Sequence, residues 1–239
     1  MDVKKRFYQE VDSIQNPAIK TFTLRALDRA DLGFWTAPCS SSGRFHPQED
    51  QGDQGVLRHL IKASNIIDQL ARRSMCSQYV TDLAKSSVLL HDICKDGPHG
   101  HWSGETDYRH GIFGAEYLEK CGSIRDKTGK QIILDAVRYH MGPWVTTLSP
   151  EKHALKFSKD PEARKKAVFS IEELNAEADE IKRALMPQSL VQKMVQDSDY
   201  FASRKEMSFL PGHPIIYDPR VHDTPEEWIE DLKDLSGLK

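Results

Sequence analysis

The chain has 239 residues, which is enough for one well-buried domain and short for two. Its charge is nearly balanced, with 33 Lys and Arg against 36 Asp and Glu and a formal net charge of -3, so tight non-specific binding to long nucleic acid is not expected. No apolar run approaches the roughly 20 residues that span a bilayer, and the N-terminus lacks the apolar centre of a secretion signal. The four cysteines form no CxxC pair, which favours a protein of the reducing cytoplasm. Binding to membranes is not expected.

Helical periodicity dominates the chain and strand-like alternation is nearly absent, so the sequence predicts an all-α fold. Helices are expected, in chain order, over residues 3–15, 17–29, 55–73, 77–94, 109–121, 127–141, 171–185 and 188–205. The intervening residues 30–54 and 143–170 are predicted to be irregular, and a short helix is expected at 225–235. We expect one domain overall, with N-terminal helices and a loop bordering the site (1–54), a helical core (55–205) and an irregular C-terminal tail packed on the core (206–239).

The dipeptide His91-Asp92 follows Val88, Leu89 and Leu90 near the end of the helix predicted over 77–94. An imidazole and a carboxylate are thereby placed at the edge of a hydrophobic core. An unpaired buried carboxylate is costly, so Asp92 requires a cation or strong hydrogen-bond donors. A packed core histidine beside a helix-end aspartate explains this pair equally well when it is taken alone.

Four further polar residues share apolar helix faces at the spacing of one helix stripe. They are His59 with Ala63, Ile66 and Leu70; His110 with Phe113, Gly114 and Tyr117; His140 with Ile133, Ala136 and Val137; and Asp199 with Val191, Val195 and Ala202. One such histidine is more often a packed core residue than a ligand. Several together would each need a separate partner in the core, whereas a shared metal cluster satisfies all of them. Imidazole and carboxylate ligands suit Fe, Mn, Co, Ni or Zn.

The order of these residues, H…HD…H…H…D, resembles the HD-domain metallohydrolase superfamily. The resemblance covers roughly residues 35–205 and rests on His59, on HDICKDG with His91-Asp92, on His110 in RHGIFGAEYL, on His140 in AVRYHMGP and on Asp199 in DYFASRK. It implies a helical bundle of the HD-domain type. The set of six is fairly specific for the superfamily and poorly specific for the substrate.

The resemblance also implies roles for individual residues. His59, His91, Asp92 and Asp199 match ligands of a first metal, Asp92 also matches the bridge between two metals, and His110 and His140 match ligands of the second. Asp199 is preferred to Asp197 because it fits the superfamily's ADYxASR pattern better. Lys95 matches the lysine of the HDxxK variant, which faces the substrate phosphate.

Some of these roles have a simpler alternative. A solvated lysine at a helix end is the other interpretation of Lys95. The stretch PCSSSGRFHP is similar to a segment that borders the active site in some HD hydrolases. It offers Arg44 and His46 for a second phosphate or a sugar, although both residues fit an ordinary surface loop equally well.

The reaction expected from this set is hydrolysis of a phosphomonoester or phosphodiester by a metal-activated water, with Asp92 and Lys95 as catalytic residues. The expected substrate is small and phosphorylated, of the nucleotide type. Two alternatives use related sites: a di-iron oxygenase of the same fold uses the same six ligands, and a 3′–5′ exonuclease would act on a polynucleotide end. A ligand sensor without activity ranks last, because all six candidate ligands are present. The sequence gives no indication of the oligomeric state.

Overall fold

The structure is a computed structural model that describes residues 2–40, 46–101, 104–142, 145, 147, 149–166, 171–204, 208–209 and 216–217. Arg44 and the helix expected at 225–235 lie outside these residues, as does most of the C-terminal tail. The predicted all-α fold is confirmed. In the described part, extended structure is limited to the two-residue strands β1 (Ser208–Phe209) and β2 (Ile216–Tyr217), which pair antiparallel.

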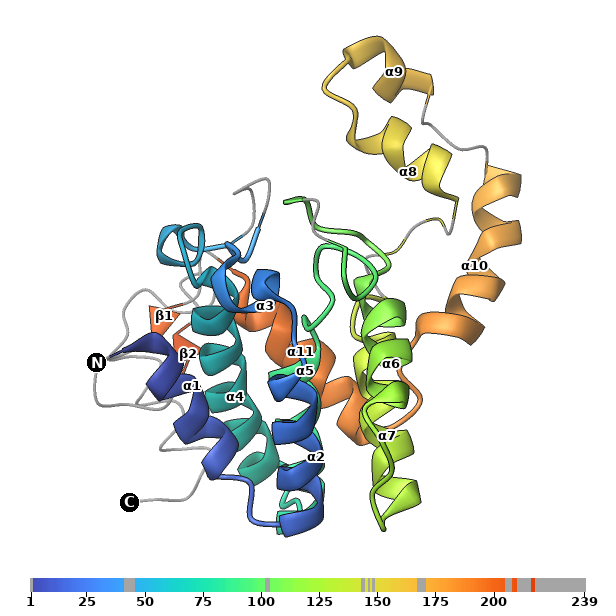
Figure 1. Ribbon diagram of the computed structural model, residues 1–239. Coiled ribbons are helices and arrows are strands. Elements are labelled where there is room, and N and C mark those ends of the chain that lie inside the picture. The colour runs from blue at the N-terminus through green and yellow to red at the C-terminus, as the bar shows by residue number, and fades with distance from the viewer. Residues whose placement is uncertain are drawn as a thin grey trace.

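The longer helices follow the predicted periodicity closely (Figure 1). They are α1 (Val3–Asp12), α2 (Pro17–Asp28), α4 (Gly55–Arg73), α5 (Gln78–Leu90), α6 (His110–Lys120), α7 (Lys127–Tyr139), α10 (Ile171–Leu185) and α11 (Leu190–Ala202). Capping residues define the N-terminal ends of several of these helices. Asn16 accepts hydrogen bonds at the N-terminus of α2, with Pro17 in the first turn, and Ser189 forms a capping box with Gln192 at the start of α11.

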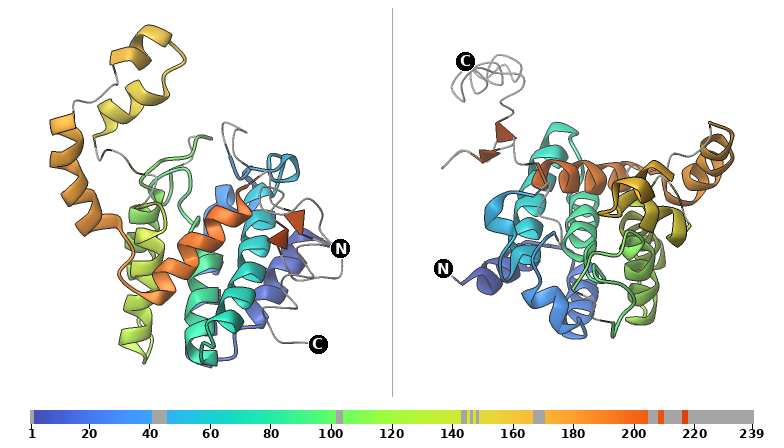
Figure 2. Two further views of the ribbon diagram at one scale, coloured as in Figure 1. Left: turned by 180° about the vertical axis from the view of Figure 1, so that it is seen from behind. Right: turned by 90° about the horizontal axis from the view of Figure 1, so that it is seen from above.

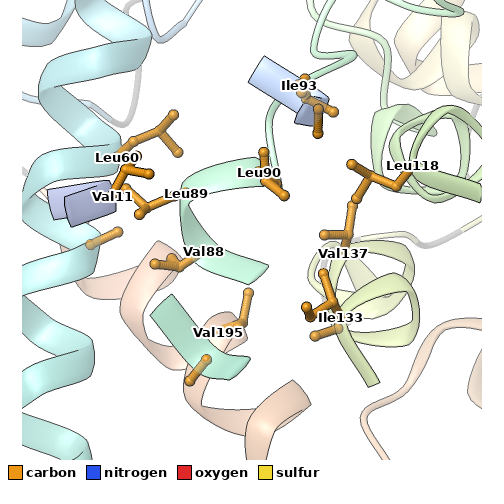
Figure 3. Close-up of a cluster of buried hydrophobic side chains, with 14 of the residues drawn as sticks. Val11, Leu60, Val88, Leu89, Leu90, Ile93, Leu118, Ile133, Val137 and Val195 are labelled. Atoms are coloured by element: carbon orange, nitrogen blue, oxygen red, sulfur yellow. The ribbon is translucent and has the colours of Figure 1, made fainter. Parts of the chain in front are cut away.

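Helix α5 lies at the centre of the bundle and packs against α2, α4, α7 and α11. Every residue from Asp82 to Leu90 is buried, as expected for a helix that neighbours surround on all sides. In Figure 3, Leu89 faces Leu60 of α4, and Leu90 lies toward Leu118 and Val137. Burial of each such side chain contributes about 1.5–3 kcal/mol, so the end of α5 is held inside the core.

The N-terminal helices α1 and α2 pack on α4 and α5, and buried polar contacts join them. The carboxylate of Asp82, on α5, accepts hydrogen bonds from the backbone N–H groups of Gln15 and Asn16 at 3.2 and 2.7 Å. A hydrogen bond of 2.7 Å links the hydroxyls of Thr23 and Ser86. These partners satisfy polar groups that α5 carries into the core. The proposed boundaries of the three chain regions stay a prediction.

Two segments expected to be irregular contain short helices. Residues 30–54 include α3 (Leu32–Thr36) and the 3₁₀ turn η1 (Gln48–Asp50), and residues 143–170 include α8 (Pro150–Phe157) and α9 (Pro161–Lys166). These corrections have local causes: Phe34 is buried against the N-terminal helices, and the Ser149 hydroxyl caps α8. Helices α8, α9 and α10 form an arm that stands apart from the bundle (Figure 2).

The ends of five helices gather at one end of the bundle. These are the C-terminal ends of α5, α7 and α11 and the N-terminal ends of α4 and α6 (Figure 1). Because the consecutive helices α4 and α5 run in opposite directions, as do α6 and α7, residues that are far apart in the sequence meet there. Among the described helices, none combines the length and apolar character needed to cross a bilayer.

Candidate metal centre

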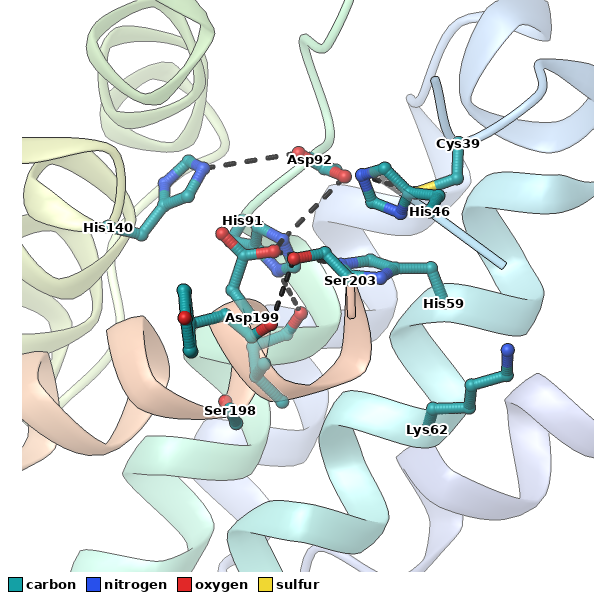
Figure 4. Close-up of polar contacts among 12 residues, drawn as sticks. Cys39, His46, His59, Lys62, His91, Asp92, His140, Ser198, Asp199 and Ser203 are labelled. Atoms are coloured by element: carbon teal, nitrogen blue, oxygen red, sulfur yellow. Dashed lines mark hydrogen bonds and ion pairs between the residues drawn. The ribbon is translucent and has the colours of Figure 1, made fainter. Parts of the chain in front are cut away.

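The structure brings the six predicted ligand residues together at the end of the bundle where the five helix ends meet (Figure 4). His59 lies near the start of α4, His91-Asp92 directly follows α5, His110 begins α6, His140 directly follows α7, and Asp199 lies in the last turn of α11. The four histidines and Asp92 are at most 2% exposed, and the side chain of Asp199 is 14% exposed.

The first group of side chains surrounds the Asp199 carboxylate. Oδ1 of Asp199 lies 3.0 Å from Nε2 of His59 and 3.6 Å from Nε2 of His91. One donor atom from each of these three residues falls within 4.8 Å of the others. Two imidazole nitrogens and a carboxylate oxygen at this spacing can hold one divalent transition-metal ion.

The second group surrounds Asp92. Its Oδ1 lies 3.0 Å from Nε2 of His110 and 4.0 Å from Nε2 of His140, and its Oδ2 lies 3.6 Å from Nε2 of His91. Asp92 therefore lies between His91, which belongs to the first group, and the His110–His140 pair. A carboxylate in this position can contact two cations at once.

The histidine rings are turned toward the centre by bonds to backbone carbonyls. Nδ1 of His91 donates to Val88 O at 2.7 Å and Nδ1 of His140 donates to Val137 O at 2.6 Å, since a carbonyl can only accept. Nδ1 of His110 donates in the same way to the carbonyl of Asp107. In a neutral ring this leaves the lone pair on Nε2, the arrangement that outer-sphere partners impose on metal-binding histidines.

Two of these lone pairs face each other. Nε2 of His110 and Nε2 of His140 are only 2.9 Å apart, although both rings already donate from Nδ1. Two acceptor atoms at this distance in a buried site repel each other unless a cation or a proton lies beside them. The donor atoms present thus fit a bound metal ion.

Buried polar atoms support the same conclusion. Nε2 of His59, Nε2 of His91 and Oδ1 of Asp92 make no hydrogen bond to any group in the described part of the chain, despite their short distances to opposite charges. Leaving a buried polar atom unsatisfied costs about 1–3 kcal/mol. Metal ions bound at the two groups of side chains would satisfy all three atoms.

The electrostatics keep both carboxylates ionised. Burial alone would raise the pKa of Asp92, but Lys95, His91 and His110 hold it well below its ordinary value. The pKa of Asp199 is also held well below its ordinary value, because nearby His59 and His91 outweigh burial. Burial lowers the pKa of His140, and the neighbouring His91 and His110 lower it further. The site therefore presents negative carboxylates and a neutral His140 imidazole, the forms that bind metals.

Residues 56–204, well over half of the sequence, match the family model of the HD domain. The chain belongs to the HD domain family. The HD domain defines a superfamily of metal-dependent phosphohydrolases, whose members bind divalent metals. Comparisons with curated proteins and with solved structures gave no match.

Within the HD domain, the structure separates the two candidate aspartates of α11. Asp199 faces the histidines, whereas Asp197 forms an ion pair with Lys193 on the outer side of the helix. Lys95 lies beside the centre, with Nζ 2.5 Å from Oδ2 of Asp92 and a side chain that is 12% exposed. It is therefore placed at the edge of the centre, with a small part of its side chain reaching solvent. The roles of these residues stay predictions.

The predicted substrate residue His46 lies deeper than its loop position indicated. Its ring is 5.1 Å from that of His59, and its pKa is lowered to about 2 by burial and by the nearby His59 and Lys95. The thiol of Cys39, to which the sequence analysis gave no role, lies 3.8 Å from Nε2 of His46. The position of Cys39 in the stretch PCSSSGRFHP, which the sequence analysis associated with the active site, could have indicated that the thiol lies near the centre.

A second residue without a predicted role is Gly111 in α6. A Cβ atom there would lie 2.7 Å from Val137 O and 3.0 Å from Nδ1 of His140. Glycine therefore allows α6 to approach α7 closely enough for His110 and His140 to meet. Because this contact depends on the packing of two helices, the sequence alone did not reveal it.

We expect Gly111→Ala to weaken metal binding, since the added methyl group displaces Val137 O or the His140 ring. The expected loss of affinity is about 10- to 100-fold, the effect of disturbing an outer-sphere partner. Gly114→Ala is the matched control, because the nearest atom to its Cβ would be a Val137 methyl carbon at 3.0 Å, and the next atoms lie at an ordinary contact distance of 3.7 Å. Metal affinity measured by calorimetry, with helix content measured by circular dichroism, checks this. Equal affinities in the two variants would contradict the proposed role of Gly111.

Proposed function

We propose that this HD domain hydrolyses a phosphomonoester or phosphodiester of a small, nucleotide-type substrate with two divalent transition-metal ions. His59, His91, Asp92 and Asp199 would hold the first ion, and Asp92, His110 and His140 the second. When bound, such a pair of ions supplies a water molecule of lowered pKa and neutralises charge on the phosphoryl oxygens.

The observation that carries this proposal is the pair of facing imidazoles beside Asp92. Nε2 of His110 and Nε2 of His140 are 2.9 Å apart, and Nε2 of His110 is 3.0 Å from Oδ1 of Asp92. This arrangement requires positive charge at a second position in addition to the one beside Asp199. A second ion next to the first is the arrangement used for phosphate-ester hydrolysis.

Lys95 supports a phosphorylated substrate. Its ammonium group lies at the edge of the centre, next to a carboxylate that we assign to both ions. Burial would lower the pKa of Lys95, but Asp92 raises it above its ordinary value, so the side chain is charged. A fixed positive charge at this position can contact a non-bridging phosphoryl oxygen or the leaving group.

The test is metal analysis of the purified protein combined with a panel of substrates. We expect about two transition-metal ions per chain and hydrolysis of bis(p-nitrophenyl) phosphate and of at least one nucleotide with Mn, Co or Ni. The panel should include a single-stranded oligonucleotide, since release of single nucleotides from its end would indicate an exonuclease. Oxygen consumption by an iron-loaded protein that hydrolyses no phosphate ester would overturn the proposal in favour of the oxygenase.

Lys95→Gln is expected to lower kcat/KM by about 10²-fold, because it removes one charged contact to the phosphoryl group. Metal content should stay near the wild-type value, since Lys95 donates to Asp92 and is not itself a ligand. Lys193→Gln is the control, because Lys193 is exposed and pairs with Asp197 on the side of α11 that faces away from the six-residue centre. An unchanged kcat/KM in Lys95→Gln would show that this lysine only pairs with Asp92.

A further inference from the structure

A second group of metal-binding side chains adjoins the HD centre on the side of α4. Cys39, His46 and His59 offer a thiol sulfur and two ring nitrogens that all lie within 4.8 Å of one another. Figure 4 shows Cys39 and His46 beside His59, on the opposite side of the centre from His140. We call these three residues the thiol triad. His59 belongs both to this triad and to the group around Asp199.

The fold holds the thiol triad in place. The backbone N–H of Cys39 donates to the carbonyl of Asp50 at 2.8 Å. The Asp50 carboxylate is fully buried and accepts two hydrogen bonds of 2.9 Å from Lys62 of α4. The amide of Gln51 donates to the carbonyl of His46 at 2.9 Å. Cys39 is thus tied through Asp50 to the helix that carries His59, and His46 is tied to Gln51 in the segment that precedes this helix.

Three of the four ring nitrogens of the triad make no hydrogen bond to the described residues. Nδ1 of His46 and both ring nitrogens of His59 make no hydrogen bond within the described residues, although all three atoms are buried. His59 and Cys39 are fully buried, so water from the bulk does not reach them. Such atoms carry a desolvation cost that a bound cation would remove.

The chemistry of the triad differs from that of the two groups around Asp92 and Asp199. It offers a thiol and imidazoles and no carboxylate, and this donor set selects soft or borderline ions such as Zn²⁺, Cd²⁺ or Cu⁺ over Mn²⁺ or Mg²⁺. A divalent ion that binds here replaces the thiol proton, which goes to solvent, so that a sulfur–metal bond forms with no change of oxidation state.

We propose that Cys39, His46 and His59 form an inhibitory site for a thiophilic cation. A cation held there competes with the HD centre for His59, and excess Zn²⁺ or Cd²⁺ therefore lowers the activity. The inhibition rests on the proposed hydrolase function, whereas the binding of the cation does not. The site gives the protein a response to soft metals that the six HD ligands alone would not provide.

The probe is Cd²⁺, added to chelated protein that carries Cys76→Ser so that the half-buried thiol of Cys76 does not contribute. We expect Cys39→Ser in this background to bind one Cd²⁺ fewer per chain and to lose the ultraviolet thiolate-to-Cd²⁺ charge-transfer band. Cys121→Ser is the matched control: its thiol is buried and donates to Tyr117 O, and we expect the band and stoichiometry to be retained. His46→Gln should weaken Cd²⁺ binding at this site by at least about tenfold, the loss typical even of an outer-sphere partner.

Activity provides a separate measurement. We divide the rate of hydrolysis with excess Zn²⁺ by the rate without it. This ratio should be well below one for the Cys76→Ser parent and for Cys121→Ser. It should stay near one for Cys39→Ser. An unchanged charge-transfer band and Cd²⁺ stoichiometry in Cys39→Ser, in protein whose circular dichroism matches the parent, would overturn the site. If no phosphate ester is hydrolysed, the hydrolase function fails, while the binding measurements still decide on the thiol triad.

Discussion

Replacing Asp92 with asparagine is expected to lower kcat/KM for phosphate-ester hydrolysis by about 10²- to 10³-fold or more. Asparagine keeps the shape of the side chain and removes its negative charge. Oδ1 of Asp92 lies beside His110 and His140, and Oδ2 lies beside His91, so the change affects both proposed ion positions. Metal content measured by plasma mass spectrometry should fall together with the rate.

Asp197→Asn provides a control of the same chemistry on the same helix as Asp199. Asp197 pairs with Lys193 away from the histidines, and an exposed pair of this kind contributes little to stability. This variant should keep both its metal and its rate. If Asp92→Asn also kept its full metal content and its rate, the assignment of the centre would be wrong.

Removing the metal ions should lower the melting temperature by about 5–10 °C for each ion present at roughly 100 times its Kd. Without a cation, the His110 and His140 nitrogens face each other at 2.9 Å, and the buried atoms of His59 and His91 lose the partner that would satisfy them. The expected measurement is a calorimetric melt of chelated protein before and after Mn²⁺ or Co²⁺ is restored.

His140→Gln shows whether this stabilisation comes from the centre. The variant lacks one ligand of the second proposed ion, so its melting temperature should respond less to added metal than that of the wild type. The same increase in both proteins would place the stabilising ion elsewhere in the molecule. Far-ultraviolet circular dichroism of both proteins establishes that the helices remain formed.

The bundle helices were predictable because each carries a continuous apolar stripe and a recognisable start or stop. The predicted range 55–73 agrees with the observed bounds of α4, and the predicted range 127–141 extends only two residues beyond the end of α7. Helices α3, α8 and α9 were missed. They have between five and eight residues, too few for periodicity to show, and single caps or contacts such as Ser149 define them.

The meeting of six polar residues was also predictable, since His59, His110, His140 and Asp199 interrupt apolar stripes that must face the core. What the sequence did not show depends on contacts between elements. The role of Gly111 follows from the distance between α6 and α7, and that of Cys39 follows from the bond between its loop and Asp50. Arg44 lies outside the described residues, so its predicted contact with the substrate is still a prediction.

The bonds from His91 and His140 to the carbonyls three residues earlier have one more consequence. A backbone carbonyl in the last turn of a helix has no backbone N–H donor from the following turn. Each ring donates to such a carbonyl in its own helix, so the histidine also acts as the end cap of α5 or α7. An alanine at either position would therefore unwind a helix terminus as well as remove a nitrogen donor. Helix length and ion affinity are thus coupled through a single side chain, and an insertion or deletion in the last turn of α5 or α7 should abolish metal binding even when every ligand residue is retained.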